Sequence, residues 1–152
     1  LIFVAKHVFN FYVEDPTNED EKFQRIKIRR FIKQLELNGL DEKKFLNTLN
    51  NLKHSNNVIG FYVKKNLREN SFFNYKKNQI ILNKNFFIQP QEIVFRAFSD
   101  CLKIIGKKYY SVRGKKVSMI IDEITNNCLS KATLGGCIVE KIEQTVILSK
   151  ER

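Results

Sequence analysis

The sequence predicts an α+β protein in which a mainly helical part carries small β-hairpins. Apolar residues recur at helical spacing through the first and middle parts of the chain. Shorter apolar segments, broken by turn residues, follow after residue 70 and again at the end of the chain. With 152 residues, 43% of them hydrophobic, the chain is long enough for one ordinary domain or for two small ones that share a core.

The first predicted helix runs from about Asp20 to Leu37, where Asn38-Gly39 ends it. Glu19, Asp20 and Glu21 are expected at the start of this helix, where the macrodipole favours negative charge. We therefore expect Asn18 or Asp20 to cap the helix. A turn at Asp15-Pro16 comes before it, because proline fixes its own φ and biases the preceding residue towards extended geometry.

The same helix carries one basic stripe between two apolar faces. Placed at about 100° per residue, the cations share one arc: Lys22, Arg25, Arg29 and Lys33. Apolar residues lie on both sides of it: Ile28, Phe31, Ile32 and Leu35 on one side, and Phe23 and Ile26 on the other. Such a helix is expected to lie between two bodies and to present its cations at their junction.

A second helix is predicted after Asp41, which can cap it, because Phe45, Leu49 and Leu52 repeat at helical spacing. The pattern leaves two alternatives open for the residues that follow. Either the polar segment KHSNN interrupts the helix, or the helix continues through VIGFYVKKNL. Next, FFNYKKNQIIL predicts a β-hairpin with Lys77-Asn78 as its two-residue turn.

A third helix is expected to begin near Pro90 and to end at Gly106. Its apolar residues predict a core helix: Ile93, Val94, Ala97, Phe98, Cys101 and Ile105. A fourth helix is expected through Met119 to Ile124. The last segment, KATLGGCIVEKIEQTVILSK, predicts two strands joined near Lys141 to Gln144, with a bulge or a close backbone approach at Gly135-Gly136.

The charge of the chain favours a polyanionic partner. The net charge is +11, from 27 Lys and Arg against 16 Asp and Glu, and a domain this basic most often binds nucleic acid. Arg25, Arg29 and Lys33, at i, i+4 and i+8, can follow a row of phosphates. The segment KKYYSVRGKK adds Tyr110 and Arg113, which combine a stacking surface with charge and suit unstacked bases.

Other function classes find no support in the sequence. No apolar run reaches the roughly 20 residues that cross a bilayer. Three cysteines without a C-x-x-C pair, and two isolated histidines, argue against a zinc site, a disulfide framework and a Cys-His nucleophile pair. We expect the cysteines to be small buried residues. Because no phosphate loop, G-x-G-x-x-G or G-x-S-x-G motif occurs, no catalytic residue and no metal ligand is predicted.

Several motifs resemble those of a known family. Asp15, Pro16, Thr17 and Asn18 fit the pattern D-P-[ST]-N, and Phe23, Arg25, Lys27 and Arg29 fit F/Y-x-R-x-[RK]-x-R. The segments GLDEKKFLNTLNNL, QPQEIVFRAF, GKKYYSVR and TLGGCIV follow in the family's order. The chain thus resembles the tRNA(Ile)-lysidine synthetases of alphaproteobacteria over nearly its whole length. It departs from them at Thr17, where serine is commoner, and at Lys27, which keeps the charge of the usual arginine but loses its bidentate fork.

The resemblance implies that the parent protein is a cytoplasmic ligase. Enzymes of this family use ATP and magnesium to adenylate C2 of the wobble cytidine of tRNA(Ile) with anticodon CAU. Lysine then displaces AMP to form lysidine. The family's ATP loop, S-G-G-x-D-S, is absent from this sequence and is expected upstream of Leu1. We therefore expect a C-terminal portion that binds neither ATP nor magnesium and is inactive alone.

The resemblance also implies a division of the chain and a set of functional residues. Residues 1–18 are expected to be the tail of a truncated α/β ATP-pyrophosphatase domain, residues 19–70 a helical linker that contacts tRNA, and residues 71–152 a small α+β region. Asp15 and Asn18 are expected at the edge of the active site. The expected tRNA-binding residues are Arg25, Lys27, Arg29, Lys33, Tyr110 and Arg113.

Two other function classes stay open. A free-standing, non-enzymatic RNA-binding module would keep the basic surfaces and lack the ATP-binding half. A helical DNA-binding regulator would share the charge and the helices. The sequence also leaves open which residues select tRNA(Ile) over tRNA(Met), and whether the parent enzyme is a homodimer.

Overall fold

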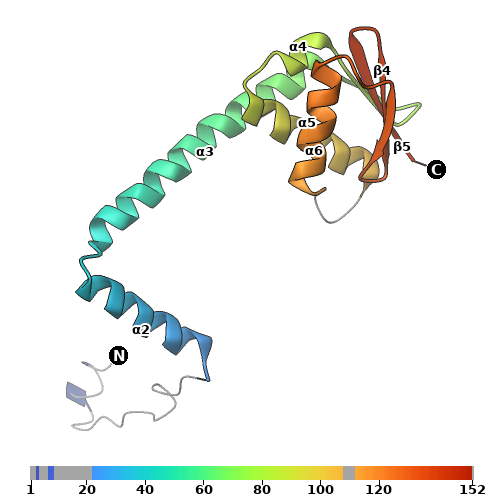
Figure 1. The fold of residues 1–152 in the computed structure, drawn as a ribbon. Coiled ribbons are helices and arrows are strands. Elements are labelled where there is room, and N and C mark those ends of the chain that lie inside the picture. Colours follow the sequence, from blue (N-terminus) through green and yellow to red (C-terminus); the bar gives the residue numbers. More distant parts are fainter. Residues whose placement is uncertain (1–2, 4–6, 9–21, 108–111, 152) are drawn as a thin grey trace. The chain divides into compact units, whose positions relative to one another are not determined.

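A computed structural model describes residue 3 and residues 7–8, 22–107 and 112–151 of the chain (Figure 1). The chain divides into two compact units, Leu1–Asn51 and Leu52–Arg152, and the boundary falls within one helix, α3. This division rests on compactness. The functional boundaries expected at residues 18 and 70 stay predictions.

Helix α2 (Gln24–Leu37) is the basic amphipathic helix that the sequence predicts. It begins later than expected, with Phe23 as its N-cap, and the Phe23 side chain makes no capping hydrogen bond. No acidic residue lies in its first turn. The expectation that Asn18 or Asp20 caps this helix is therefore wrong, because both residues precede the N-cap by more than a residue.

The connection after α2 confirms both signals read from the sequence. The N–H of Gly39 (φ +94°) donates to the carbonyl of Glu36 at 3.0 Å, and the N–H of Leu40 donates to the carbonyl of Leu35 at 2.9 Å. These two bonds form a Schellman motif, which satisfies the last carbonyls of the helix. Asp41 then caps the next helix, since its Oδ1 accepts from the N–H of Lys44 at 3.1 Å.

Helix α3 (Glu42–Asn70) settles the alternative that the sequence left open. It is one continuous helix of 29 residues, about 44 Å long at 1.5 Å per residue. The polar segment KHSNN does not interrupt it. Within that segment, Asn56 Oδ1 accepts a hydrogen bond from the Arg96 guanidinium at 2.6 Å, and Arg96 also pairs with Glu92 at 2.6 Å. A contact made forty residues away in sequence thus holds the polar turn in helical form.

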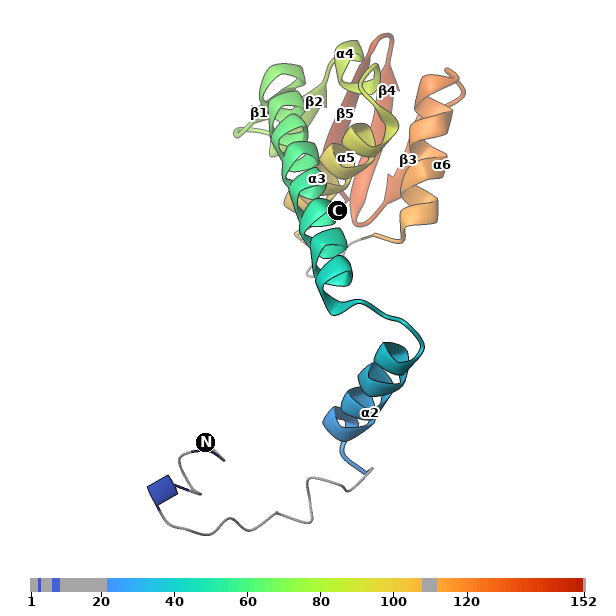
Figure 2. The same ribbon diagram turned by 90° about the vertical axis from the view of Figure 1, so that its left-hand side faces the viewer.

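Within the described residues, five short strands form one antiparallel sheet, in the order β1-β2-β5-β4-β3 (Figure 2). The mixed class and the hairpins that the sequence predicts are confirmed. The strands are β1 (Ser71–Asn74), β2 (Gln79–Leu82), β3 (Lys131–Leu134), β4 (Cys137–Ile142) and β5 (Thr145–Lys150).

The two predicted strand regions differ from expectation in detail. Asn74 pairs with Gln79, so residues 75–78 form a four-residue loop in place of the two-residue Lys77-Asn78 turn. Asn78 provides the left-handed conformation in this loop (φ +50°). The end of the chain holds three strands instead of two, because the segment before Gly135-Gly136 forms a strand of its own.

Three helices accompany the sheet, and α5 and α6 cover one of its faces (Figures 1 and 2). Helix α5 (Gln91–Gly106) begins after Pro90 and ends at Gly106, as predicted. Helix α6 (Gly114–Thr125) contains the predicted segment. Helix α4 (Lys84–Phe87) is a single turn that the sequence did not predict. Its cap is Asn83, whose side-chain oxygen accepts from the N–H of Phe86 at 3.2 Å.

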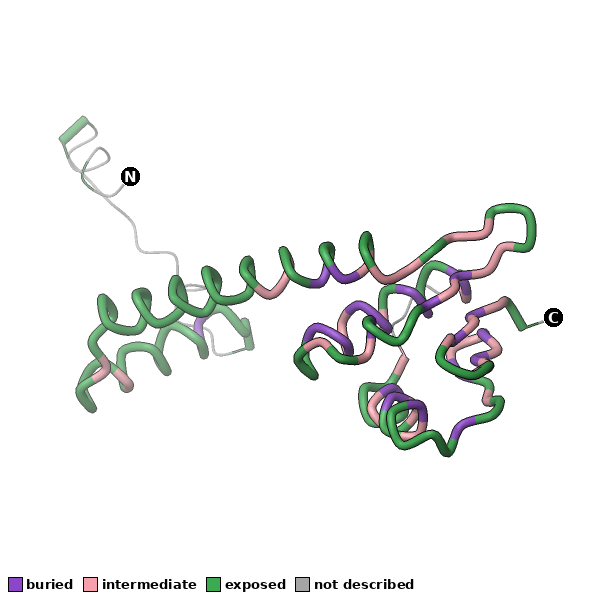
Figure 3. The backbone as a smooth tube through the Cα atoms, turned by 90° about the horizontal axis from the view of Figure 1, so that it is seen from above, coloured by how far each residue is buried: buried purple, intermediate pink, exposed green. Residues whose placement is uncertain are grey.

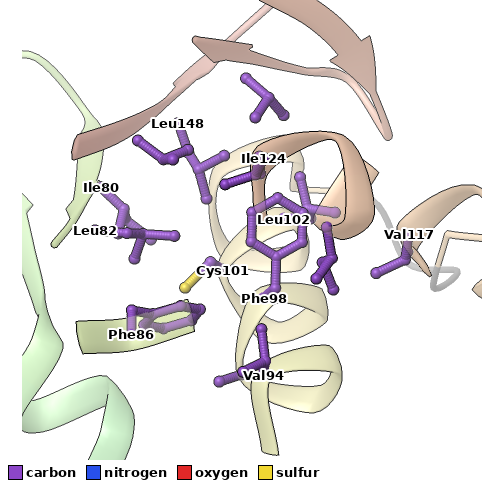
Figure 4. Close-up of a cluster of buried hydrophobic side chains, with 14 of the residues drawn as sticks. Ile80, Leu82, Phe86, Val94, Phe98, Cys101, Leu102, Val117, Ile124 and Leu148 are labelled. Atoms are coloured by element: carbon purple, nitrogen blue, oxygen red, sulfur yellow. The ribbon is translucent and has the colours of Figure 1, made fainter. Parts of the chain in front are cut away.

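The core of the second unit lies between α5, α6 and the sheet (Figure 4). All six residues predicted for the apolar face of α5 are buried, and Leu102 joins them. Phe86 of α4 and Leu82 and Leu148 of the sheet pack into the same cluster. Burial of each such side chain contributes about 1.5–3 kcal/mol. Figure 3 shows the buried residues gathered in this unit, whereas α2 has one buried residue, Ile26.

Asn66 connects α3 to this core. It is the one buried polar residue among those described, with 3% of its surface exposed. Its amide donates to the carbonyl of Phe86 at 3.2 Å, and its side-chain oxygen accepts from Asn70 at 2.8 Å. An unpaired buried amide costs about 1–3 kcal/mol, so the Asn66 side chain favours the one arrangement in which both of these bonds form. They hold the second half of α3 against α4.

The end of α5 approaches the β3–β4 turn very closely. A Cβ at Gly106 would overlap the carbonyl oxygen of Gly135 and would lie 3.3 Å from Cys137 Sγ. Gly135 itself has a φ of +65°, which favours glycine. The close backbone approach predicted at Gly135-Gly136 is confirmed.

Gly106→Ala is expected to lower the free energy of unfolding by about 1–3 kcal/mol, because the backbone must shift to admit a methyl group. The matched control is Gly60→Ala inside α3, where a Cβ would meet nothing within 4 Å. This control is expected to raise the free energy of unfolding by up to about 1 kcal/mol, since alanine is the better helix former. Urea denaturation followed by circular dichroism measures both. Similar effects of the two substitutions would contradict the close approach.

Candidate nucleic-acid interface

The positive charge of the chain is concentrated in the second unit. Residues 52–152 carry 18 Lys and Arg against 8 Asp and Glu. Residues 1–51 carry 9 against 8. The first unit is therefore nearly neutral as a whole, and its basic character is local to α2. The excess of positive charge in the second unit attracts polyanions.

The basic stripe of α2 is open to solvent. Arg25, Arg29 and Lys33 are all exposed. Arg25 lies over the ring of Phe23, with Cζ 5.4 Å from the ring centroid, a cation–π contact that orients the guanidinium. No ion pair joins these three residues to a carboxylate within the part of the chain that the structure describes. Arg25, Arg29 and Lys33 thus keep their charge available for phosphate.

Lys27 lies apart from this stripe. It follows Arg25 by two positions, and in an α-helix this places it about 200° away around the axis. Lys27 is exposed, but it faces the side of α2 opposite to Arg25. The structure therefore does not bring Lys27 together with the other predicted cations of α2. A ligand that lies along one side of the helix can contact the stripe or Lys27, but not both.

The apolar faces beside the stripe are largely uncovered among the described residues. Phe31 is 59% exposed, Ile28 is 51% exposed and Ile32 is 44% exposed. By contrast, Ile26 on the other side is buried, with 4% exposed. The prediction that α2 lies between two bodies stays a prediction.

Arg113 belongs to a second group of cations, in the second unit. It is the N-cap residue of α6 and is exposed. Other exposed cations lie on the last turns of α5 and the first turn of α6: Lys103, Lys107, Lys115 and Lys116. Within the described ranges, none of these five residues forms an ion pair with a carboxylate. Tyr110, Asp15 and Asn18 lie outside the described residues, so their predicted roles stay predictions.

One small cavity lies beside the second unit's hairpin. It has a volume of about 200 Å³ and is lined by residues of α4, the end of α6 and the β4–β5 hairpin, among them Lys84, Asn127 and Lys141. The Lys141 ammonium donates to the carbonyl of Ile124 at 2.7 Å and also to Asn127 Oδ1. Lys141 therefore stabilises the C-terminal end of α6, where a positive charge is favourable. Because its ammonium already donates to these two oxygens, we do not count it among the cations that could bind a ligand.

The cysteines have different environments. Cys101 and Cys137 are buried as expected, but Cys128 is exposed, so the expectation is wrong for that residue. Burial, with a smaller contribution from Asp100, raises the pKa of the Cys101 thiol to about 12. Cys101 is thus a neutral thiol at physiological pH and not a nucleophile. In the described ranges there is no group of three His, Cys, Asp or Glu residues that could hold a metal ion, and no helix has the length and apolarity to span a membrane.

Two curated relatives are similar to the chain. The tRNA(Ile)-lysidine synthase of Bartonella tribocorum is 21% identical over 151 residues, which cover 93% of this chain and 28% of the relative. The tRNA(Ile)-lysidine synthase of Ruegeria pomeroyi is 25% identical over 129 residues, which cover 84% of this chain and 30% of the relative. This chain is similar to the tRNA(Ile)-lysidine synthases.

The similarity to these synthases confirms the family resemblance that the sequence motifs indicate. The chain spans less than a third of the length of either synthase that it matches. No protein-family model and no solved structure matches the chain. The relationship to the synthases therefore rests on sequence.

In the native protein, iodoacetamide is expected to modify Cys128 and to leave Cys101 and Cys137 unmodified at pH 8. The thiolate is the reactive form, and Cys101 stays protonated until the pH approaches its raised pKa of about 12. Mass spectrometry counts the adducts, and the chain in urea, where all three cysteines react, is the control. Native modification of Cys101 as fast as that of Cys128 would contradict the burial of α5.

Proposed function

We propose that this chain is the tRNA-binding portion of a tRNA(Ile)-lysidine synthase. The parent enzyme would use ATP to adenylate the wobble cytidine of tRNA(Ile) with anticodon CAU and would attach lysine at C2 to form lysidine. The observation that carries the proposal is the similarity to two such synthases over most of the chain. The concentration of positive charge in residues 52–152 supports an RNA partner.

In this proposal the exposed cations bind the sugar-phosphate backbone. Arg25, Arg29 and Lys33 form a row along one side of α2, at a spacing that follows successive phosphates. Arg113 and the exposed lysines near it would hold a second stretch of backbone. Tyr110 would stack on a base, and Asp15 and Asn18 would shape the edge of the active site.

The chemical step belongs to the rest of the parent enzyme. We assign ATP, magnesium and lysine to that part, because the family's S-G-G-x-D-S loop does not occur in this sequence. The chain alone is proposed to be inactive. Its work in the cytoplasm would be to position the tRNA, as a monomer or as part of a homodimer, while the catalytic part acts on the anticodon.

A titration with tRNA and with duplex DNA of similar charge, at several salt concentrations, tests the proposal. We expect tighter binding to tRNA(Ile) than to duplex DNA at every salt concentration, because shape and unpaired bases add to the electrostatic attraction. Fluorescence anisotropy of labelled nucleic acid measures the affinities. Equal affinity for both would contradict a tRNA-specific role and leave a general polycation. Equal affinity for tRNA(Ile) and unrelated RNA would favour a free-standing RNA-binding module.

The double variant Arg25→Ala and Arg29→Ala is expected to weaken tRNA binding and to flatten the plot of log affinity against log salt by about two charges. The physical reason is that each phosphate contact releases counterions when it forms, so a variant with fewer contacts releases fewer counterions. The matched control is Lys43→Ala with Lys44→Ala, which removes the same charge from the start of α3. An unchanged slope in the α2 variant would assign its arginines to folding or to contacts with another domain.

A further inference from the structure

The second half of α3 exposes an aromatic face that the proposed function does not use. Phe61 is 64% exposed, Val58 is 57% exposed and Tyr62 is 46% exposed. In the same turns, Ile59, Val63 and Leu67 pack against the core of the second unit. The core therefore fixes the rotation of the helix about its axis and directs the aromatic rings to solvent.

The two rings are arranged as a pair. The centroids of Phe61 and Tyr62 are 5.4 Å apart, and their planes meet at 85°, an edge-to-face contact. In this geometry at least one ring face is left uncovered. Since Val58 lies one turn earlier on the same side, the three residues form a contiguous apolar patch. Contiguous exposed apolar patches mark interaction sites, whereas apolar residues exposed singly need no such explanation.

Cations surround the aromatic pair. Lys65 follows Phe61 by four residues and Tyr62 by three, so it lies on the same side of the helix. Lys64 and Arg68 are also exposed, four residues apart on the adjoining side. Arg68 makes a loose ion pair with Glu69, at 3.5 Å and well exposed, which contributes little. Neither lysine is in an ion pair within the described part of the chain.

We propose that this α3 aromatic face (Val58, Phe61, Tyr62, Lys64, Lys65 and Arg68) binds a stretch of RNA whose bases are unpaired. The rings stack on exposed base faces, and the ammonium and guanidinium groups contact the flanking phosphates. A duplex does not fit this face, because its base faces are covered by stacking. The positive charge of the second unit favours RNA over a protein partner for the same patch. The proposal rests on the proposed function in that it takes RNA as the partner.

A tryptophan reporter tests the proposal directly, since the chain has no tryptophan. In a Tyr62→Trp variant of the full chain, single-stranded RNA is expected to quench the fluorescence through stacking on the indole, and an RNA duplex of equal length is not. The matched control is Phe72→Trp, at a site on β1 that is 65% exposed. It is expected to respond to neither RNA.

An affinity measurement completes the test. Phe61→Ala with Tyr62→Ala is expected to weaken binding of the single-stranded RNA by about 5- to 30-fold and to leave binding of the duplex unchanged. Phe72→Ala, which also removes an exposed ring, is expected to leave both unchanged. Circular dichroism confirms that the variants fold, which is expected because both rings lie outside the core.

The outcomes separate this proposal from the proposed function. One contrary outcome is that RNA binds but does not quench the fluorescence of the Tyr62→Trp variant. Another is that the double alanine variant binds single-stranded RNA with unchanged affinity. Either outcome overturns the proposal for the α3 aromatic face and leaves the proposed RNA-binding function intact. Absence of RNA binding by the unchanged chain overturns both. If the double alanine variant abolishes self-association in sedimentation and RNA affinity stays the same, the face is a protein interface and the proposal is wrong.

Discussion

The packing of α5 against one face of the antiparallel sheet is the constraint on which the second unit depends. Seven buried residues of α5 contact the strands, α6 and the single turn of α4. Because this helix uses about half of its surface for the core, every neighbouring element is placed relative to it. Helix α3 is one of these elements, since Val63, Leu67 and the buried amide of Asn66 meet the same cluster. The side of each helix that does not pack into this core is the side that is exposed to solvent.

The parts of the fold that follow from local pattern were predictable from the sequence. Helix α5 has apolar residues at helical spacing throughout, between Pro90 before its start and Gly106 at its end. The end of α2 is marked by Asn38-Gly39, because glycine adopts the left-handed conformation that the Schellman hydrogen bonds require. The parts that depend on distant contacts were not. The polar segment in the middle of α3 is held by Arg96, forty residues further on. Strand β3 has two exposed residues in four, so its pattern is too weak to mark a strand without its partner β4.

The candidate interface shows the same limit. The spacing of Arg25, Arg29 and Lys33 predicted an exposed stripe, and the three residues are exposed in one helix. Lys27 was grouped with them through a family motif, and the helix places it on the opposite side. The aromatic pair of α3 could not be singled out from the sequence, because its exposure depends on which side of the helix enters the core. Motifs identify residue types, whereas packing decides which of them meet a partner.

Lys141 illustrates how formal charge and available charge differ. Its ammonium reaches from β4 to the end of α6, where it donates to the backbone carbonyl of Ile124 and to the side-chain oxygen of Asn127. An amine held in this way has exchanged part of its hydration for protein oxygens, so fewer of its N–H groups are left to contact a phosphate, although its charge still adds to the field of the unit. Lys141 therefore has a structural role, and it also contributes one positive charge to the net charge of the chain. Acetylation of Lys141 would therefore act twice: it would loosen the end of α6 and would lower the net charge of the unit by one, whereas acetylation of an exposed lysine without such bonds would change the charge alone.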